Sequence, residues 1–212
     1  MSNQTHIDEV LEQKWPKLIF LAGKTSTGKT TLSKSLEKKY GYTVIELDNV
    51  IRGLNVPDGA NGFIEAYLNR DYEDFTSSFV IAVKNQIEES LASQLGVIIE
   101  GALSNVETLK EIVAPWSESF LIIFLHPSNI ESYKERLLSR FVLSSQDDGN
   151  GLPGSFWEKF TTEQLERYYV DRLITPDIED VVTEFALESA KTSEARFAKL
   201  SNGFDQMLKI EV

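Results

Sequence analysis

The chain has 212 residues, of which 42% are hydrophobic and 25% charged, and its formal net charge is −12. This composition is typical of a soluble globular protein, and the length suits one α/β domain spanning residues 1–212. The absence of cysteine excludes disulfides and thiolate metal sites. No apolar run reaches transmembrane length and no secretory signal is visible, so we expect a cytoplasmic location and no membrane partner.

The charge is unevenly distributed along the chain. Residues 1–40 hold seven lysines and four acidic residues, a net charge of +3, which leaves 14 basic and 29 acidic residues, or −15, for the rest. An acidic body repels nucleic-acid backbones. We therefore expect a small-molecule partner rather than DNA or RNA, while the sequence gives no indication of the oligomeric state.

The N-terminal part of the chain leads into a glycine-rich loop. Residues 1–14 are polar and predict a short helix or a frayed end, and the apolar run at 18–22 predicts a buried strand. Residues 23–30 then read Gly-Lys-Thr-Ser-Thr-Gly-Lys-Thr, and a helix-like run follows at 31–39. This is the pattern and the context of a phosphate-binding loop, or P-loop, although an incidental glycine-rich turn is the alternative.

Phosphate binding accounts for the residue types in this loop. Its glycines let the backbone amides point inward, and the following helix adds free amides and a positive dipole end. We expect Lys29 to reach the β- and γ-phosphates of ATP and the Thr30 hydroxyl to bind Mg²⁺. The predicted nucleotide-binding residues are Gly23, Lys24, Thr25, Ser26, Thr27, Gly28, Lys29, Thr30 and Thr31.

Downstream of the loop, hydrophobic periodicity predicts alternating strands and helices. Further strands are expected at 43–47, 97–100, 120–125 and 207–212, and further helices at about 75–95, 106–113, 129–142, from 162 and at 182–200. The first of these helices carries an apolar stripe with a four-residue repeat, which predicts a buried face. The segments 49–71 and 144–155 are typical of loops. This alternation predicts a parallel sheet with helices on both faces.

Charged residues follow two of the predicted strands, where ligands bind in open parallel sheets. Asp48 and Arg52 follow the second strand, and Glu100-Gly101 follows the third. Asp48 is a candidate to orient or deprotonate an acceptor hydroxyl, and Glu100 to support Mg²⁺ or the substrate. Arg52 and Gly101 are candidate substrate contacts. Asp48 as a helix cap, Glu100 as an ion-pair partner and Arg52 as a surface residue are the alternatives.

Four segments together resemble a known family: GKTSTGKTTL, ELDNVIR, VIIEGAL and IIFLHPSNIESYKERLLSRF. They are similar to the small P-loop kinases of the nucleoside/nucleotide kinase superfamily, which includes shikimate, gluconate and uridine kinases and chloramphenicol phosphotransferase. The resemblance spans about residues 17–143. Glu46-x-Asp48 only partly matches the Asp-x-Asp of shikimate kinases, and their triple glycine is absent.

The resemblance implies a three-layer α/β fold with a five-stranded parallel sheet of order 2-3-1-4-5. It also implies that 49–71 covers the acceptor and that about 144–160 forms a LID, a segment that closes over the phosphates. Arg136 and Arg140 resemble the arginines that lead into the LID and stabilise the transferred charge. His126, which precedes a proline, is interpreted as structural.

These observations favour an ATP- and Mg²⁺-dependent kinase that acts on a small molecule, such as a nucleoside, nucleotide or sugar acid. Two alternatives remain open. One is a P-loop regulator or NTPase switch, and the other is a toxin-type kinase acting on sugar-nucleotide precursors. The sequence does not identify the acceptor.

Overall fold

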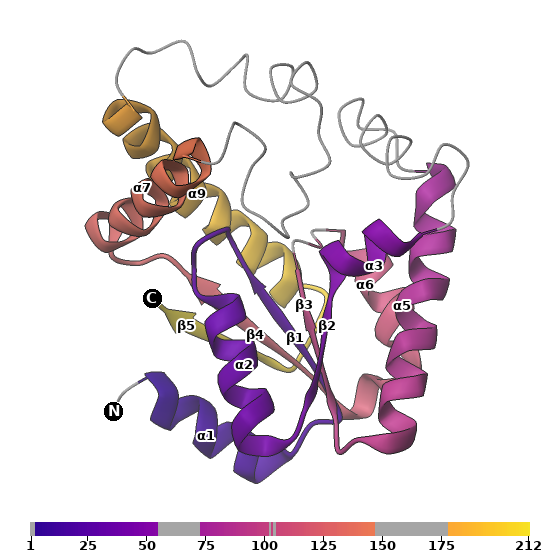
Figure 1. Ribbon diagram of the computed structural model, residues 1–212. Coiled ribbons are helices and arrows are strands. Elements are labelled where there is room, and N and C mark those ends of the chain that lie inside the picture. Colours follow the sequence, from indigo (N-terminus) through magenta and orange to yellow (C-terminus); the bar gives the residue numbers. More distant parts are fainter. Residues whose placement is uncertain (1–2, 55–72, 102, 104, 147–177) are drawn as a thin grey trace.

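The protein is built around a five-stranded parallel sheet (Figure 1). The computed structural model describes residues 3–54, 73–101, 103, 105–146 and 178–212. The strands are β1 (Leu18–Gly23), β2 (Thr43–Glu46), β3 (Val97–Glu100), β4 (Phe120–His126) and β5 (Met207–Glu211). Their spatial order is β2-β3-β1-β4-β5, and all four pairings are parallel. The predicted strand order is therefore confirmed.

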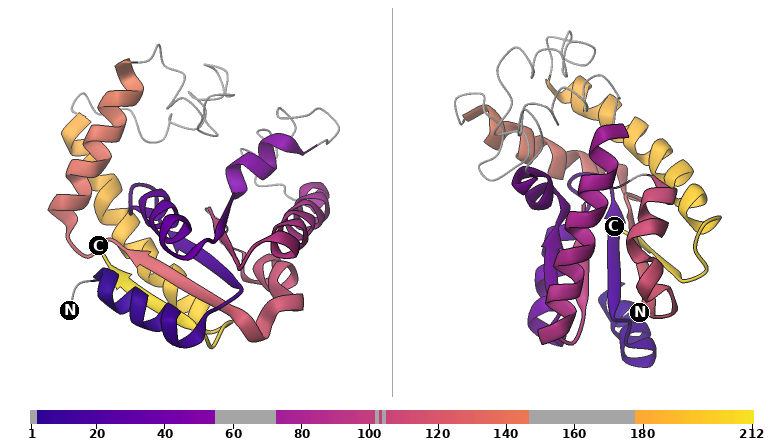
Figure 2. Two further views of the ribbon diagram at one scale, coloured as in Figure 1. Left: turned by 60° about the horizontal axis from the view of Figure 1, so that its bottom comes forward. Right: turned by 90° about the vertical axis from the view of Figure 1, so that its right-hand side faces the viewer.

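Helices pack on both faces of the sheet (Figure 2). One face carries α1 (Asn3–Lys14) and α2 (Lys29–Tyr40), and the other carries α5 (Glu73–Ser93), α6 (Val106–Val113) and α9 (Ile178–Ser201). The remaining described helices are α3 (Leu47–Gly53), the 3-10 helix η1 (Ala114–Ser119) and α7 (Ile130–Gln146). No helix in the described ranges is long and apolar enough to cross a membrane.

Strand β1 shows why the central strands are apolar throughout. All six of its residues are buried, with Leu18 and Phe20 in the core beneath α5, α6 and α9. Ile19 and Leu21 face the opposite core, beneath α1 and α2. Side chains of a strand alternate between the two faces, so a strand covered on both sides needs a continuous hydrophobic run.

The topological switch point of the sheet lies between β1 and β3. These strands are neighbours, yet the helix that follows β1 lies on one face and the helix that follows β3 lies on the other. In open α/β sheets, the carboxyl end of such a pair is where ligands bind. The P-loop follows β1 and Glu100-Gly101 follows β3, so both meet at this edge.

The structure contains a helix at the start of the predicted loop 49–71. Strand β2 ends at Glu46 rather than Leu47, and residues 47–53 form α3 instead of extended chain. Leu47 and Val50 lie one helical turn apart and are both buried in the core, which stabilises this short helix. The rest of the predicted acceptor-covering segment 49–71, from residue 55 onward, lies outside the described residues.

Two further helix boundaries differ from those predicted. Helix α5 ends at Ser93, and Leu95 is 64% exposed rather than part of the core. A four-residue repeat drifts about 40° per step around a helix of 3.6 residues per turn, so the stripe rotates out of the core. Helix α7 continues to Gln146, so 144–146 are helical. The rest of the predicted LID and the helix expected from 162 lie outside the described residues up to 177.

Candidate active site

The P-loop has the backbone conformation of a phosphate cradle. Gly23, Ser26 and Gly28 have φ angles of 150°, 57° and 92°, all in the region that L-residues rarely adopt. A Cβ at Gly23 would lie 2.8 Å from both the Leu125 carbonyl oxygen and the Thr27 Oγ1. The loop therefore requires glycine at its first position, as the motif predicts.

Two side chains of the P-loop segment donate hydrogen bonds to the same backbone carbonyl group. Lys29 Nζ and Thr27 Oγ1 both donate to the Lys24 carbonyl oxygen, each at 2.8 Å. Thr27 is buried, with 2% of its surface exposed. The ammonium group of Lys29 therefore folds back over the loop, where phosphates bind in P-loop proteins.

Glu100 is bound by two hydroxyl groups of α2. Thr30 Oγ1 donates to Glu100 Oε1 at 2.5 Å, and Ser33 Oγ donates to Glu100 Oε2 at 2.7 Å. Glu100 is 8% exposed and Ser33 is 1% exposed, so these contacts are shielded from water. The structure thus brings the predicted residues Thr30 and Glu100 together.

Ser33 was not predicted from the sequence. It lies three residues after Thr30, which places both hydroxyls on the same face of α2. That spacing is a visible signal, but its meaning depends on knowing that β3 ends opposite this face. Local patterns do not carry that tertiary information.

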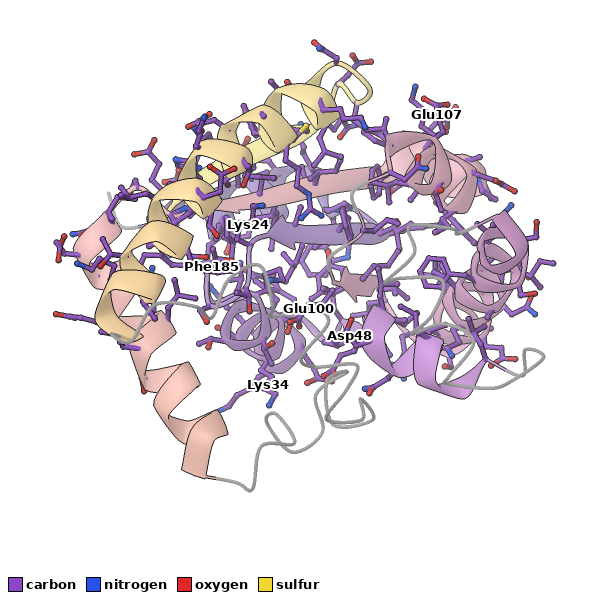
Figure 3. All side chains as sticks on the ribbon, turned by 90° about the horizontal axis from the view of Figure 1, so that it is seen from above. Lys24, Lys34, Asp48, Glu100, Glu107 and Phe185 are labelled. Atoms are coloured by element: carbon purple, nitrogen blue, oxygen red, sulfur yellow. The ribbon has the colours of Figure 1, made fainter. Side chains whose placement is uncertain are left out.

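The candidate acceptor residues sit on and beside α3. Asp48 is exposed in the first turn of this helix, rather than at a strand end as predicted. Figure 3 looks onto the carboxyl edge of the sheet and shows Asp48 beside Glu100, between α2 and α3. Gly101 packs against Leu47, whose Cβ would lie 2.7 Å from an added Cβ. Arg52 is also in α3, and its side chain lies outside what the structure describes.

Helix α7 contacts the P-loop through Tyr133. The Tyr133 hydroxyl donates to the Thr25 carbonyl oxygen at 3.1 Å, and the Arg136 guanidinium lies 5.9 Å from the centre of the Tyr133 ring. Of the two predicted arginines, Arg136 is therefore placed near the loop by this chain of contacts. Arg140 is one turn further along α7, and its side chain lies outside the described set.

Buried polar atoms without a hydrogen bond gather at this site. Ser26 Oγ in the P-loop, and Nε and Nη2 of Arg136 on α7, are all inaccessible to water and unpaired. Such groups carry a free-energy cost unless a ligand or water satisfies them. All three can donate a hydrogen bond, which suits an anionic ligand.

His126, at the end of β4, belongs to a separate network. Its Nδ1 lies 3.1 Å from Ser193 Oγ and its Nε2 lies 3.1 Å from Glu194 Oε1, both on α9. Glu194 also pairs with Lys209 of β5 at 2.6 Å. Burial lowers the pKa of His126 below its usual value, although Glu194 partly opposes this shift. These contacts join β4, β5 and α9, which agrees with the structural role expected for His126.

The residues present fit a magnesium ion that is shared with a nucleotide. The described part of the chain contains no group of three or more His, Asp or Glu that could hold a metal ion alone. Mg²⁺ in phosphoryl-transfer sites commonly takes only one or two protein ligands, with phosphates and water supplying the rest. The Thr30–Glu100 pair offers a hydroxyl and a carboxylate of the required kind.

The parallel sheet order and the P-loop together define a P-loop α/β protein. A family model described as an AAA domain, AAA_33, matches residues 18–140. The match covers more than half of the chain, and the chain belongs to this family.

Individual relatives are distant. The chain is 26% identical over 154 residues to adenylate kinase isoenzyme 5 of Bos taurus, which covers 72% of this chain and 26% of that protein. It thus spans about a quarter of the length of this curated relative.

Two solved structures are also similar. A gluconokinase from Sinorhizobium meliloti 1021 has 20% identity and a TM-score of 0.42, over 89% of this chain and 95% of that one. A shikimate kinase from Bacteroides thetaiotaomicron has 16% identity and a TM-score of 0.45, over 91% and 85% respectively.

Proposed function

We propose that the protein is an ATP- and Mg²⁺-dependent kinase that transfers the γ-phosphoryl group to a small-molecule acceptor in the cytoplasm. The observation that carries this proposal is Glu100, which is bound to Thr30 and Ser33 of α2 and lies beside Asp48 of α3. This arrangement supports a site in which the phosphate cradle and an acceptor-side carboxylate would lie on either side of a bound metal ion. Phosphoryl transfer requires the nucleotide and the acceptor to be bound next to each other.

The P-loop would bind the triphosphate. Lys29 would exchange the Lys24 carbonyl for β- and γ-phosphate oxygens, while the loop amides and Ser26 Oγ donate to the same group. Phosphate oxygens are charged, so they are better acceptors for an ammonium group than a neutral carbonyl. The remaining residues of segment 23–31 would shape the cradle around them.

Thr30 and Glu100 would hold Mg²⁺. The Thr30 hydroxyl donates its hydrogen bond to the carboxylate, so the lone pairs of its oxygen stay available to a cation. When bound, the ion would neutralise charge on the β- and γ-phosphates. Ser33 would keep the other carboxylate oxygen in place.

The acceptor would approach from α3. Asp48 would accept the proton of the attacking hydroxyl as that oxygen bonds to the γ-phosphorus and ADP departs with the bridging oxygen. Arg136, and Arg140 one turn beyond it, would stabilise charge on the transferred group. Arg52 and Gly101 would contact the acceptor. We also propose that 49–71 and about 144–160 close over the two substrates, within a single domain of residues 1–212.

The test is ADP formation with and without candidate acceptors, covering nucleosides, nucleoside monophosphates and sugar acids. We expect ADP formation to depend on an acceptor, and Lys29→Ala to abolish it. The matched control is Lys38→Ala, an exposed lysine in the last turn of the same helix. Full-rate hydrolysis without any acceptor would instead support an NTPase switch. Activity confined to sugar-nucleotide precursors would support the toxin-type kinase.

A further inference from the structure

One buried polar group remains after the phosphate cradle is accounted for. Among the described residues, the buried side-chain atoms without a hydrogen bond belong to Ser26, Arg136 and Arg196. The first two adjoin the P-loop, where a triphosphate would satisfy them. The third lies on α9, and no role proposed above uses it.

Arg196 reaches the edge of the sheet where the site lies. Its Nη2 donates at 2.5 Å to the carbonyl oxygen of Leu103, three residues beyond Glu100 in the chain. On the same helix, Ser193 contacts His126 at the end of β4, and the Phe197 ring packs 5.4 Å from that of Phe124.

The path of this side chain follows from the strand order. Helix α9 packs on β4, Leu103 follows β3, and β1 lies between these two strands. The side chain of Arg196 therefore extends from the β4 side of the sheet toward the chain that follows β3, and β1 with its P-loop lies between these two points in the sheet. Arg196 does so on the face opposite α2, because α9 shares its core with α5 and α6.

The charge of Arg196 is poorly compensated. Burial lowers the pKa of Arg196 to about 10, so the guanidinium remains a cation at neutral pH. Its hydrogen bond goes to a neutral carbonyl, its Nε is unpaired, and no carboxylate of the described residues forms an ion pair with it. A largely buried cation without an anion is costly for the fold. The residue as a whole is partly exposed, although its unpaired Nε is buried.

We propose that Arg196 binds a negatively charged oxygen group, a carboxylate or a phosphate, on the acceptor. The inference rests on the proposed kinase function and narrows its substrate to an anionic small molecule. The proposed phosphate site lies at the start of α2, on one face of the sheet. Arg196 comes from α9 on the opposite face and contacts the chain that follows Glu100. A guanidinium suits this role because its fixed fork of donors matches carboxylate and phosphate oxygens.

A purely structural role makes the opposite prediction about stability. If Arg196 served only to attach α9 to the β3–α6 connection, Arg196→Met would lower the melting temperature and leave ligand binding unchanged. If Arg196 is instead an anion site without its anion, Arg196→Met removes the buried charge and keeps an unbranched, largely apolar side chain in its place. The melting temperature of the ligand-free protein then stays the same or rises.

The first experiment measures binding and needs no knowledge of the natural acceptor. The protein is saturated with Mg²⁺ and a non-hydrolysable ATP analogue, so that the P-loop is occupied. Its melting temperature is then followed during titration with sodium phosphate or sodium acetate, against sodium chloride at equal ionic strength. We expect phosphate, acetate or both to raise the melting temperature of the wild type above the chloride control.

The matched variants locate this effect. Arg196→Met is expected to abolish the anion-specific rise, and Lys199→Met, which removes an exposed charge from the same helix, to retain it. The relative effects of phosphate and acetate distinguish the two kinds of anionic group. An equal rise in the wild type and Arg196→Met, or no rise in the wild type, would overturn the proposal. Failure of the ATP analogue itself to raise the melting temperature would instead count against the proposed function.

A kinetic experiment then tests the same assignment with matched acceptors. AMP is compared with adenosine, and gluconate with glucose, at saturating ATP. We expect transfer only to the anionic member of a pair, with kcat/KM for it at least tenfold lower in Arg196→Met while KM for ATP is unchanged. Equal use of neutral and anionic acceptors by the wild type would contradict the anion site while leaving the kinase function intact.

Discussion

Glu100 shows how single side chains set the chemistry of this site. Its two carboxylate oxygens are each bound by a hydroxyl of the same helix, and the group is almost completely buried. A buried carboxylate that accepts from two hydroxyl donors is held in one orientation. The pair proposed to bind Mg²⁺ is thus already oriented in the ligand-free protein.

Ser33 is expected to matter through this arrangement. Ser33→Ala leaves one oxygen of Glu100 without its donor, and a hydrogen bond to a charged group contributes about 1.5–3 kcal/mol. We expect kcat to fall about tenfold and the Mg²⁺ concentration for half-maximal activity to rise, with KM for the acceptor little changed. Steady-state kinetics with Mg²⁺ varied at fixed ATP measures this.

Two control variants separate positioning from folding. Ser35→Ala removes an exposed hydroxyl from the same helix and should behave as the wild type. Ser33→Thr retains the hydroxyl and should recover most of the lost Mg²⁺ affinity. A Ser33→Ala enzyme with wild-type Mg²⁺ dependence would show that Glu100 does not need this contact.

The sequence could predict some of these residues and not others. The P-loop was predictable because its chemistry is local, and Glu100 because strand ends point to the ligand edge. Ser33 and Arg196 were missed because their partners, Glu100 and Leu103, are distant in the chain. For Asp48 the sequence left open whether it follows the strand or caps a helix, and in the structure it follows β2 within the first turn of α3.

At the scale of elements, the attachment of α9 depends on a histidine. His126 of β4 contacts Ser193 and Glu194 of α9, and Glu194 in turn contacts Lys209 of β5. Because burial lowers the pKa of His126, the unfolded chain takes up this proton at a higher pH than the folded protein does. The free energy of unfolding therefore falls as the pH drops from 6.5 through the lowered value.

His126→Gln is expected to weaken this pH dependence. Glutamine does not titrate, so between pH 7.5 and 5.5 the variant should lose less stability than the wild type, although it starts from a lower value. Urea unfolding at the two pH values measures the difference. The control is His6→Gln at the other histidine, which is exposed, and it should follow the wild-type pH profile. A wild-type profile in His126→Gln would assign the acid sensitivity to other groups.

Element boundaries were less predictable than element types. Every described strand was anticipated. Strands β1, β3 and β4 are buried along their whole length and are apolar runs, whereas the edge strands β2 and β5 are only partly buried. The errors at α5 and α7 concern the point where a helix ends, whereas α3 is a short helix at the start of a segment that was predicted to be a loop. Those points depend on which side chains find a core to pack against, as Leu47 does and Leu95 does not.

For the molecule as a whole, ligand binding and stability are linked. A ligand present at 100 times its dissociation constant stabilises the folded state by about 2.7 kcal/mol. For a chain of this size that corresponds to a rise of about 5–10 °C in melting temperature. We expect ATP with Mg²⁺ to produce such a rise, and EDTA to reverse most of it, because Thr30 and Glu100 are assigned to the ion.

A thermal-denaturation series with ATP, Mg²⁺ and EDTA checks this expectation. Lys29→Ala should show no nucleotide-dependent rise, which controls for nonspecific effects of the salt. An EDTA-insensitive rise would mean that the nucleotide binds without a metal ion. The family resemblance predicted the sheet order but not the acceptor, because the residues proposed to bind the acceptor come from separate parts of the chain, in α3, the β3–α6 connection and α9.

The hydrogen bond from Tyr133 to the P-loop also sets the direction of a peptide group. The Thr25 carbonyl oxygen points toward α7, where the Tyr133 hydroxyl binds it. In a trans peptide the next N–H points the opposite way, so the amide of Ser26 is aimed away from α7. A rotation of α7 would therefore tilt the peptide group between Thr25 and Ser26, whose amide is proposed to bind phosphate. The orientation of α7 is in this way coupled to an amide of the proposed nucleotide site.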